Sequence, residues 1–143
     1  MDLQVKFNSE FPPSRAGEYD AGIDLRATQT YNIDSCRKLV STGVYVKIPR
    51  GYVGLLIARS SLSKKGIMLT NSVGVIDSDY RGELLVSLMC WTPGGAIIEA
   101  GERIAQLVIT PIALPKLVQF NGTDEEWLDT ERGIGGFGST GKV

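Results

Sequence analysis

Short runs of alternating apolar residues, ended by glycine or proline every few positions, dominate the sequence. Successive side chains of a β-strand point to opposite faces, so this alternation is typical of strands that bury one face. Such runs are "LQVKF", "AGIDLRA", "STGVYVKIP", "YVGLLIA", "GIMLT", "AIIEA", "RIAQLVITPI" and "KLVQF". Only "SSLSKK" favours a turn of helix, with Ser60 or Ser61 as its N-cap. The pattern therefore predicts an all-β protein, specifically a jelly-roll-like β-sandwich.

Two further alternating runs lie in "TNSVGVIDSDYRGELLVSLMCW", from Thr70 to Trp91, and predict a β-hairpin. Its polar residues are concentrated in "IDSDYR", among strand residues and not at an obvious two-residue turn. Strands that part between Asn71 and Asp77 would leave backbone N–H and C=O groups outside the ladder. We therefore expect this segment to bind a polar ligand. The simpler interpretation is a hairpin with a polar tip.

The end of the chain has a different composition. After "NGTDEEWLDTE" it reads "RGIGGFGSTGKV", which contains little that could pack in a core. We expect residues 1–126 to form the sandwich and residues 127–143 to form a flexible glycine-rich arm. A disordered tail is the usual interpretation of such a terminus. However, Arg132, Phe137, Ser139 and Thr140 combine a guanidinium fork, a ring and two hydroxyls, which suits a segment that orders over an anionic ligand with a flat ring.

Composition excludes several kinds of chemistry. A length of 143 residues suits one domain, and a net charge of −1 gives no general attraction for nucleic acid or an anionic membrane. The chain has no histidine, so Ser-His-Asp catalysis and imidazole zinc sites are excluded. Acid–base work would use carboxylates, tyrosine or lysine, and a bound metal would be magnesium or calcium. Cys36 and Cys90 are expected to be buried thiols in a reducing, cytoplasmic compartment.

Five sequence patches together resemble the trimeric deoxyuridine triphosphatases, or dUTPases, which hydrolyse dUTP to dUMP and pyrophosphate. They match that family's five motifs in order and spacing across nearly the whole chain. The patches are "AGIDL" (21–25), "RSSLSKKG" (59–66), "NSVGVIDSDYRGEL" (71–84), "GERIAQLVI" (101–109) and "RGIGGFGSTG" (132–141). The resemblance implies an enzyme that keeps uracil out of DNA and supplies dUMP for thymidylate synthesis.

The resemblance assigns the central motif to the base, the sugar and the attacking water. It implies that uracil pairs with backbone groups between the parted strands, at Asn71, Gly74, Val75, Ile76, Asp77 and Leu85. Cytosine would leave some of these groups unpaired, and such sites discriminate by roughly 10⁴–10⁵. Tyr80 would crowd the 2′ position of the sugar. Asp77 would be the catalytic base for water attacking the α-phosphorus, with Asp79 as its rival in the same segment.

Other motifs are implied to hold the triphosphate. Phosphate-binding roles fall to Arg59, Ser60, Ser61 and Gln106. Arg103 is expected to be structural and to pair with a carboxylate such as Glu102 or one on a neighbouring subunit. Magnesium would be held by phosphate oxygens and waters, with Asp24 contacting it through water. The arm of a neighbouring subunit in a homotrimer would close the site through Arg132, Phe137, Gly138, Ser139 and Thr140.

Two alternatives stay open. A deoxycytidine triphosphate deaminase shares this predicted fold and also binds a pyrimidine triphosphate. However, that enzyme needs a glutamate beside the nucleobase for deamination, and its central motif is different. A β-sandwich module that binds a partner without catalysis is the second alternative. Such a module would have little need for Asp77 or the arm, and the sequence has both.

Overall fold

The computed structural model describes residues 1–8, 10–139 and 141. The chain divides into two compact units, Met1–Ala113 and Leu114–Val143. The boundary that we predicted after residue 126 stays a prediction. The first unit contains one short helix, α1 (Ser60–Ser63), and the strands β1 (Gln4–Phe7), β2 (Ile23–Arg26), β3 (Tyr31–Ile33), β4 (Lys38–Ser41), β5 (Val44–Lys47), β6 (Tyr52–Ala58), β7 (Ile67–Leu69), β8 (Gly74–Ile76), β9 (Leu85–Cys90), β10 (Ala96–Ile98) and β11 (Arg103–Pro111).

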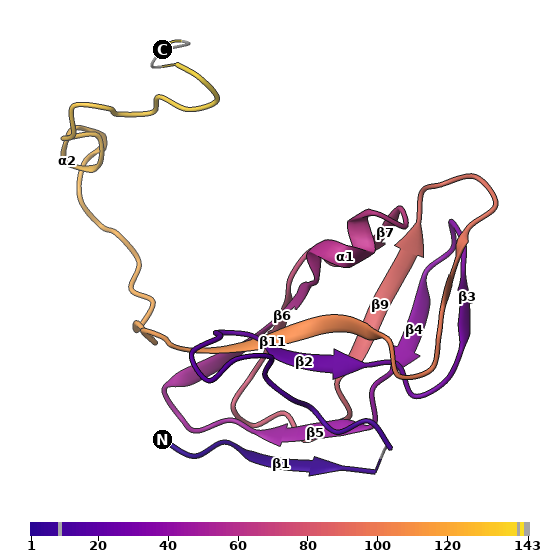
Figure 1. Ribbon diagram of the computed structural model, residues 1–143. Helices are drawn as coiled ribbons and strands as arrows, with labels where there is room; N and C mark the ends of the chain where they lie inside the picture. Colours follow the sequence, from indigo (N-terminus) through magenta and orange to yellow (C-terminus); the bar gives the residue numbers. More distant parts are fainter. Residues whose placement is uncertain (9, 140, 142–143) are drawn as a thin grey trace. The chain divides into compact units, whose positions relative to one another are not determined.

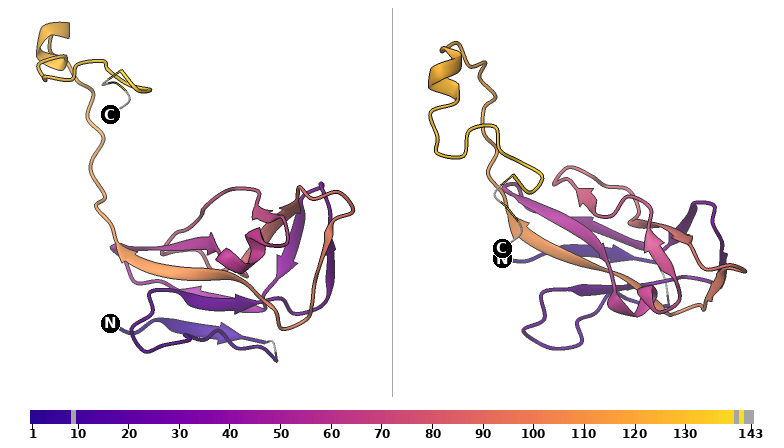
Figure 2. Two further views of the ribbon diagram at one scale, coloured as in Figure 1. Left: turned by 45° about the horizontal axis from the view of Figure 1, so that its top comes forward. Right: turned by 90° about the horizontal axis from the view of Figure 1, so that it is seen from above.

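The strands of the first unit form antiparallel sheets (Figures 1 and 2). A four-stranded sheet has the order β2-β11-β6-β8, and a three-stranded sheet has the order β4-β9-β7. Two pairs, β1-β5 and β10-β3, complete the set. Figure 1 shows β9 and β4 running in a different direction from β11 and β2. The all-β prediction is confirmed, while the jelly-roll connectivity stays a prediction.

One hydrophobic core joins these sheets. Leu25, Leu56 and Leu107 reach it from the four-stranded sheet, and Val86 and Leu88 reach it from the three-stranded sheet. These side chains are at most 3% exposed. Val86 and Leu88 occupy alternate positions of β9, as expected for a strand that buries one face.

The predicted hairpin is wrong, because its two halves belong to different sheets. β8 pairs with β6, whereas β9 pairs with β4 and β7. In the turn before β8, Ser72 has a φ of 61°, and the Val73 amide donates to the carbonyl of Asn71 at 2.6 Å. Because β8 and β9 share no ladder, these two strands part completely, more than the expected local opening would require. Alternation predicts a strand but does not say which strand is its partner.

Three other local predictions differ from the structure. Residues 116–120, "KLVQF", are irregular and exposed, because a strand needs a ladder partner and apolar alternation alone does not provide one. The N-cap of α1 is Arg59, which makes no side-chain cap bond, so neither Ser60 nor Ser61 caps the helix. Cys36 is exposed, although Cys90 is buried as expected.

The second unit contains the helix α2 (Asp124–Trp127). Thr123 and Glu126 form a capping box: the Thr123 hydroxyl accepts from the Glu126 amide at 3.2 Å, and the Glu126 carboxylate accepts from the Thr123 amide at 3.4 Å. The rings of Phe120 and Trp127 pack 5.0 Å apart, centroid to centroid. Across the described residues, no helix combines the length and apolar character needed to cross a membrane.

Candidate functional site

A polar cavity of about 390 Å³ lies beside the four-stranded sheet. Asp24 lies on β2 directly opposite Gln106 on β11, and Arg59 follows the end of β6. The sheet thus brings three of the predicted motifs together. The cavity is lined by Ala16, Asp20, Ala21, Gly22, Asp24, Arg59, Ser60 and Gln106.

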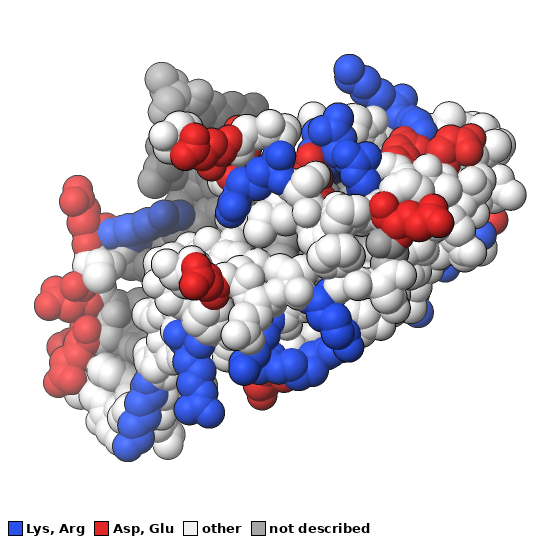
Figure 3. Space-filling view, turned by 60° about the horizontal axis from the view of Figure 1, so that its bottom comes forward, with Lys and Arg blue, Asp and Glu red and all other residues white. Residues whose placement is uncertain are grey.

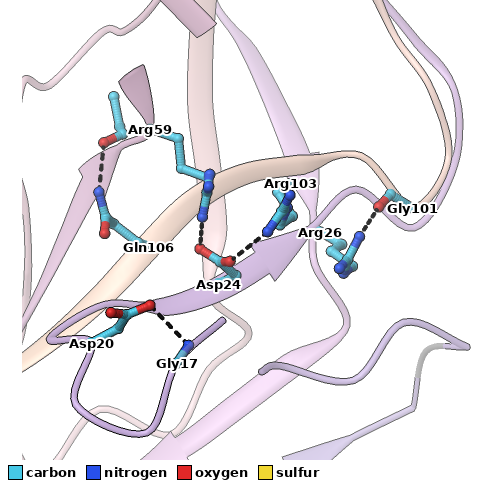
Figure 4. A network of polar contacts seen from close by, with 9 residues as sticks. Gly17, Asp20, Asp24, Arg26, Arg59, Gly101, Arg103 and Gln106 are labelled. Atoms are coloured by element: carbon cyan, nitrogen blue, oxygen red, sulfur yellow. Dashed lines mark hydrogen bonds and ion pairs between the residues drawn. The ribbon is translucent and has the colours of Figure 1, made fainter. Parts of the chain in front are cut away.

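Asp24 is the electrostatic centre of this cavity (Figure 4). Leu25 points into the core, so its neighbour Asp24 points to the other face of β2, where it is 3% exposed. A buried carboxylate needs charged partners. Asp24 receives hydrogen bonds from Arg59 to Oδ1 and from Arg103 to Oδ2, the latter at 3.4 Å. Each guanidinium has five N–H donors and shares this one carboxylate, so further donors are left for an anionic ligand.

Arg103 was expected to pair with a carboxylate such as Glu102, and it does pair with a carboxylate, but this is Asp24. Arg103 contacts Asp24, whereas Glu102 accepts from the Lys65 ammonium at 2.5 Å. A register shift in β11 between Arg103 and Ala105 accompanies this arrangement. Glu102 precedes β11, in a turn where its amide donates to the Glu99 carbonyl at 3.0 Å, so Arg103 and Glu102 have different surroundings.

Gln106 presents its amide to the same cavity. Its Nε2 donates to the carbonyl of Ala58 at 3.2 Å. A Cβ on Gly22 would lie 2.1 Å from the Gln106 Oε1, so glycine at this position leaves the space that the amide occupies. Gln106 is thereby held beside Arg59, with its amide on the lining of the cavity.

Asp20 and Asp24 are the acidic residues that line this cavity. Among the residues that the structure describes, no group of three or more His, Cys, Asp and Glu side chains could hold an ion. Asp24 and Asp20 both line the cavity, but Asp24 is paired with arginines and Asp20 accepts from the Gly17 amide at 2.9 Å. This donor set does not suit direct coordination by protein alone. It fits a magnesium ion that keeps its waters and takes other oxygens from phosphate.

A second cavity, of about 250 Å³, lies where β8 and β9 part. Exposed Asp77 follows β8, and exposed Leu85 begins β9. Seven residues line the cavity: Val75, Ile76, Asp77, Tyr80, Glu83, Leu84 and Leu85. Five of the seven predicted ligands of the base and sugar therefore line one pocket, and the predicted catalytic carboxylate is one of them.

The predicted rival of Asp77 lies elsewhere. Asp79 lines another cavity, of about 490 Å³, together with Lys47, Arg50 and Arg81. In this cavity the Arg81 guanidinium donates to the backbone carbonyls of Ser78 and Tyr80. Asp77 is the carboxylate that shares its cavity with Tyr80.

Several predicted residues lie outside these two cavity linings. Ser61 is exposed on α1, Asn71 lies in the turn before β8, and Gly74 is buried in β8. In the second unit, Arg132 Nε donates to the Gly135 carbonyl at 2.7 Å, and Phe137, Gly138 and Ser139 are exposed. Thr140 lies outside the described residues.

Cavity volume alone does not select the site. A cavity of about 610 Å³ beside β1 and β2 contains none of the predicted residues. On the face seen in Figure 3, Lys and Arg side chains lie in several groups with Asp and Glu side chains among them. The two candidate cavities are distinguished from the other cavities by the chemistry of the residues that line them. Neither cavity volume nor the overall surface charge makes this distinction.

The sequence analysis missed two polar residues of these cavities, Asp20 and Glu83. Asp20 immediately precedes the first motif, and Glu83 lies inside the central motif, where it was given no role. Their proximity to the motifs was the available indication, but neither has a sequence pattern that predicts its contacts.

Comparisons with known proteins bear on the family. A family model of dUTPases matches residues 10–141. The deoxyuridine 5'-triphosphate nucleotidohydrolase of Mycolicibacterium vanbaalenii is 45% identical over 142 residues, covering 96% of this chain and 92% of that protein. The protein of the same name from Tropheryma whipplei is 41% identical over 145 residues, covering 99% of this chain and 97% of that protein.

Solved structures agree with the sequence relatives. The dUTPase of Staphylococcus bacteriophage 80alpha, solved with dUpNHpp, has a TM-score of 0.80, 32% identity and 99% coverage of both chains. A mutant dUTPase from phage phi11 of S. aureus, described as coordinating a structural Mg(II) ion, has a TM-score of 0.75 and 29% identity over 87% of this chain and 99% of that one.

The fold and these matches define a hydrolase of nucleotide metabolism. Within that class, the chain belongs to the dUTPase family.

Proposed function

We propose that this enzyme hydrolyses dUTP to dUMP and pyrophosphate. Water attacks the α-phosphorus, the new bond forms between its oxygen and that phosphorus, and the bond from the α-phosphorus to the bridging oxygen of pyrophosphate breaks. Asp77 orients this water and accepts its proton. The observation that carries the proposal is the pocket between β8 and β9, where Asp77 and Tyr80 line one cavity.

The base and the sugar are bound in this pocket. Backbone groups of Asn71 and of residues 74–77, with Leu85 opposite, pair with the uracil edge. The parting of β8 and β9 supports this role, because their facing backbones are not joined in one ladder. Tyr80 lies against the deoxyribose and leaves no room for a 2′-hydroxyl.

The triphosphate is bound by residues of the Asp24 cavity. Arg59 has five N–H donors, so its pairing with Asp24 leaves others for phosphate oxygens. Ser60 and Ser61 donate hydroxyls and Gln106 donates its amide. Asp24 and Asp20 face the hydration shell of a magnesium ion. When bound, that ion neutralises charge on the phosphates.

The two cavities have no lining residue in common. We propose that a homotrimer brings the pyrimidine pocket of one subunit to the phosphate cavity of another. The glycine-rich arm of a subunit then closes the site, with Phe137 on the uracil ring and Arg132, Ser139 and Thr140 on the phosphates. Closing the site excludes water and positions the triphosphate, on which phosphoryl transfer depends.

Pyrophosphate release from dUTP, dCTP, dTTP and UTP tests this function. We expect release from dUTP, with at least about 10³-fold lower kcat/KM for dCTP, because cytosine leaves buried groups unpaired. Ammonia released from dCTP would instead identify a deaminase. Light scattering should give a mass three times 15.5 kDa, and a monomeric active enzyme would contradict the shared site.

A further inference from the structure

Glu83 is held in place by the turn between β4 and β5. Its Oε1 accepts from the Ser41 hydroxyl at 2.5 Å and from the Gly43 amide at 2.8 Å. The buried hydroxyl of Thr42 donates to the carbonyl of Leu84 at 2.6 Å. Charge-assisted hydrogen bonds to a carboxylate are stronger than neutral ones, so the turn fixes the start of β9.

The same residue holds the tyrosine of the pyrimidine pocket. The Tyr80 hydroxyl donates to the backbone carbonyl of Glu83 at 2.9 Å. The Tyr80 ring folds back across Gly82, where a Cβ would lie 2.3 Å from Oη and 2.5 Å from Cζ. Real Cβ atoms do not approach other heavy atoms so closely, so the ring could not keep this position beside an alanine.

We propose that Gly82 and Glu83 are positioning residues that set how closely Tyr80 approaches the sugar, and so set the discrimination between deoxyribose and ribose. This inference rests on the proposed function of the pocket. Gly82 provides the space for the ring, and the Glu83 carbonyl fixes the hydroxyl. The Glu83 carboxylate ties that carbonyl to the β4–β5 turn, which lies outside the lining of the pocket.

The measured quantity is the ratio of kcat/KM for dUTP to kcat/KM for UTP. A variant that loses part of its folded population loses the same fraction of activity on both substrates, so simple destabilisation leaves this ratio unchanged. A displaced Tyr80 admits the 2′-hydroxyl and lowers the ratio. Gly82→Ala should lower it about tenfold or more, because a shift of about 1 Å has large effects on positioning.

Glu83 is tested with two variants and a matched control. Glu83→Ala removes the anchor and should lower the ratio about five- to tenfold. Glu83→Gln keeps a carbonyl oxygen that accepts from Ser41 and Gly43, so it should restore most of the ratio. Glu102→Ala is the control: Glu102 is also half-buried and accepts from Lys65 and from the Glu99 amide at 2.9 Å. It should reduce stability and leave the ratio unchanged.

The outcomes separate the two proposals. Wild-type enzyme that turns over UTP as well as dUTP would overturn the proposed function and this inference with it. Wild-type enzyme that discriminates, with an unchanged ratio in Gly82→Ala and Glu83→Ala, would overturn this inference alone. If Gly82→Ala does not fold, Ser41→Ala replaces it in the test. This variant removes one of the two donors to the Glu83 carboxylate. If the ratio of kcat/KM values is unchanged in both Ser41→Ala and Glu83→Ala, the inference is overturned.

Discussion

The carboxylate of Asp24 pairs with the guanidinium of Arg59, 35 positions further along the chain. The Asp24 side chain is 5% exposed and that of Arg59 is 27% exposed. Asp24 is therefore the buried partner that anchors the pair, and part of the Arg59 side chain stays exposed at the cavity. A buried ion pair of this kind fixes the position of a cation that is proposed to bind phosphate.

Replacing Asp24 should reduce stability and phosphate binding together. Asp24→Asn leaves Arg59 and Arg103 without their shared anion, and we expect a loss of about 1–3 kcal/mol in the free energy of unfolding. Urea unfolding at a fixed protein concentration measures this change. Asp20→Asn, which alters an exposed carboxylate of the same cavity, should stay within about 0.5 kcal/mol of wild type. Equal stabilities for the two variants would contradict the anchoring role.

Replacing Asp77 should remove turnover but keep binding. Asp77→Asn is nearly isosteric, but it cannot accept the proton of the attacking water. We expect kcat for dUTP to fall by about 10²–10⁴-fold. Calorimetric titration with a non-hydrolysable dUTP analogue should still show binding. Asp79→Asn is the matched control and should have the kcat of the wild-type enzyme. If Asp79→Asn instead loses most of its kcat while Asp77→Asn stays active, Asp79 is the catalytic base.

Deleting residues 132–143 should slow catalysis without unfolding the first unit. The residues of the hydrophobic core cluster, as far as the chain is described, lie between Leu25 and Leu107, so the deletion removes none of them. We expect kcat/KM to fall by about 10²-fold or more because the closed site is lost. Thermal unfolding of the shortened chain should match wild type within a few degrees. A collapse of the unfolding transition would show that the arm is structural.

Phe137 should report arm closure. Its side chain is exposed in the free chain, so Phe137→Trp places an indole where the base is proposed to stack. Adding a non-hydrolysable dUTP analogue should change its fluorescence. Trp91 and Trp127 also emit, so the wild-type protein and a Trp127→Phe background are the controls. An emission change no larger than in these controls would contradict stacking.

The strands could largely be predicted from the sequence, because a period of two is a local property. β1, β2, β5, β6, β7, β10 and β11 all fall within predicted runs. β3 and β4 were missed because "YNI" and "KLVS" are too short to show a clear alternation. α2 was missed although Thr123 and Glu126 have the spacing of a capping box.

Which strand pairs with which was decided only by the tertiary structure. β8 and β9 are close in sequence and were predicted to pair, yet they belong to different sheets. Residues 116–120 alternate like a strand and have no regular structure. Pairing depends on which edge is near in space, and alternation along one segment does not contain that information.

Six polar residues of the two candidate cavities, Asp24, Arg59, Ser60, Asp77, Tyr80 and Gln106, were predicted from motifs in the sequence, and Asp20 and Glu83 were not. Their partners were not predicted. The folded arrangement of strands and turns decides these partners. It brings Arg103 as well as Arg59 to Asp24. It also brings the Tyr80 hydroxyl to the backbone carbonyl of Glu83. Residue type sets which bonds a side chain is able to form, but only the fold brings the second atom within about 3 Å of the first.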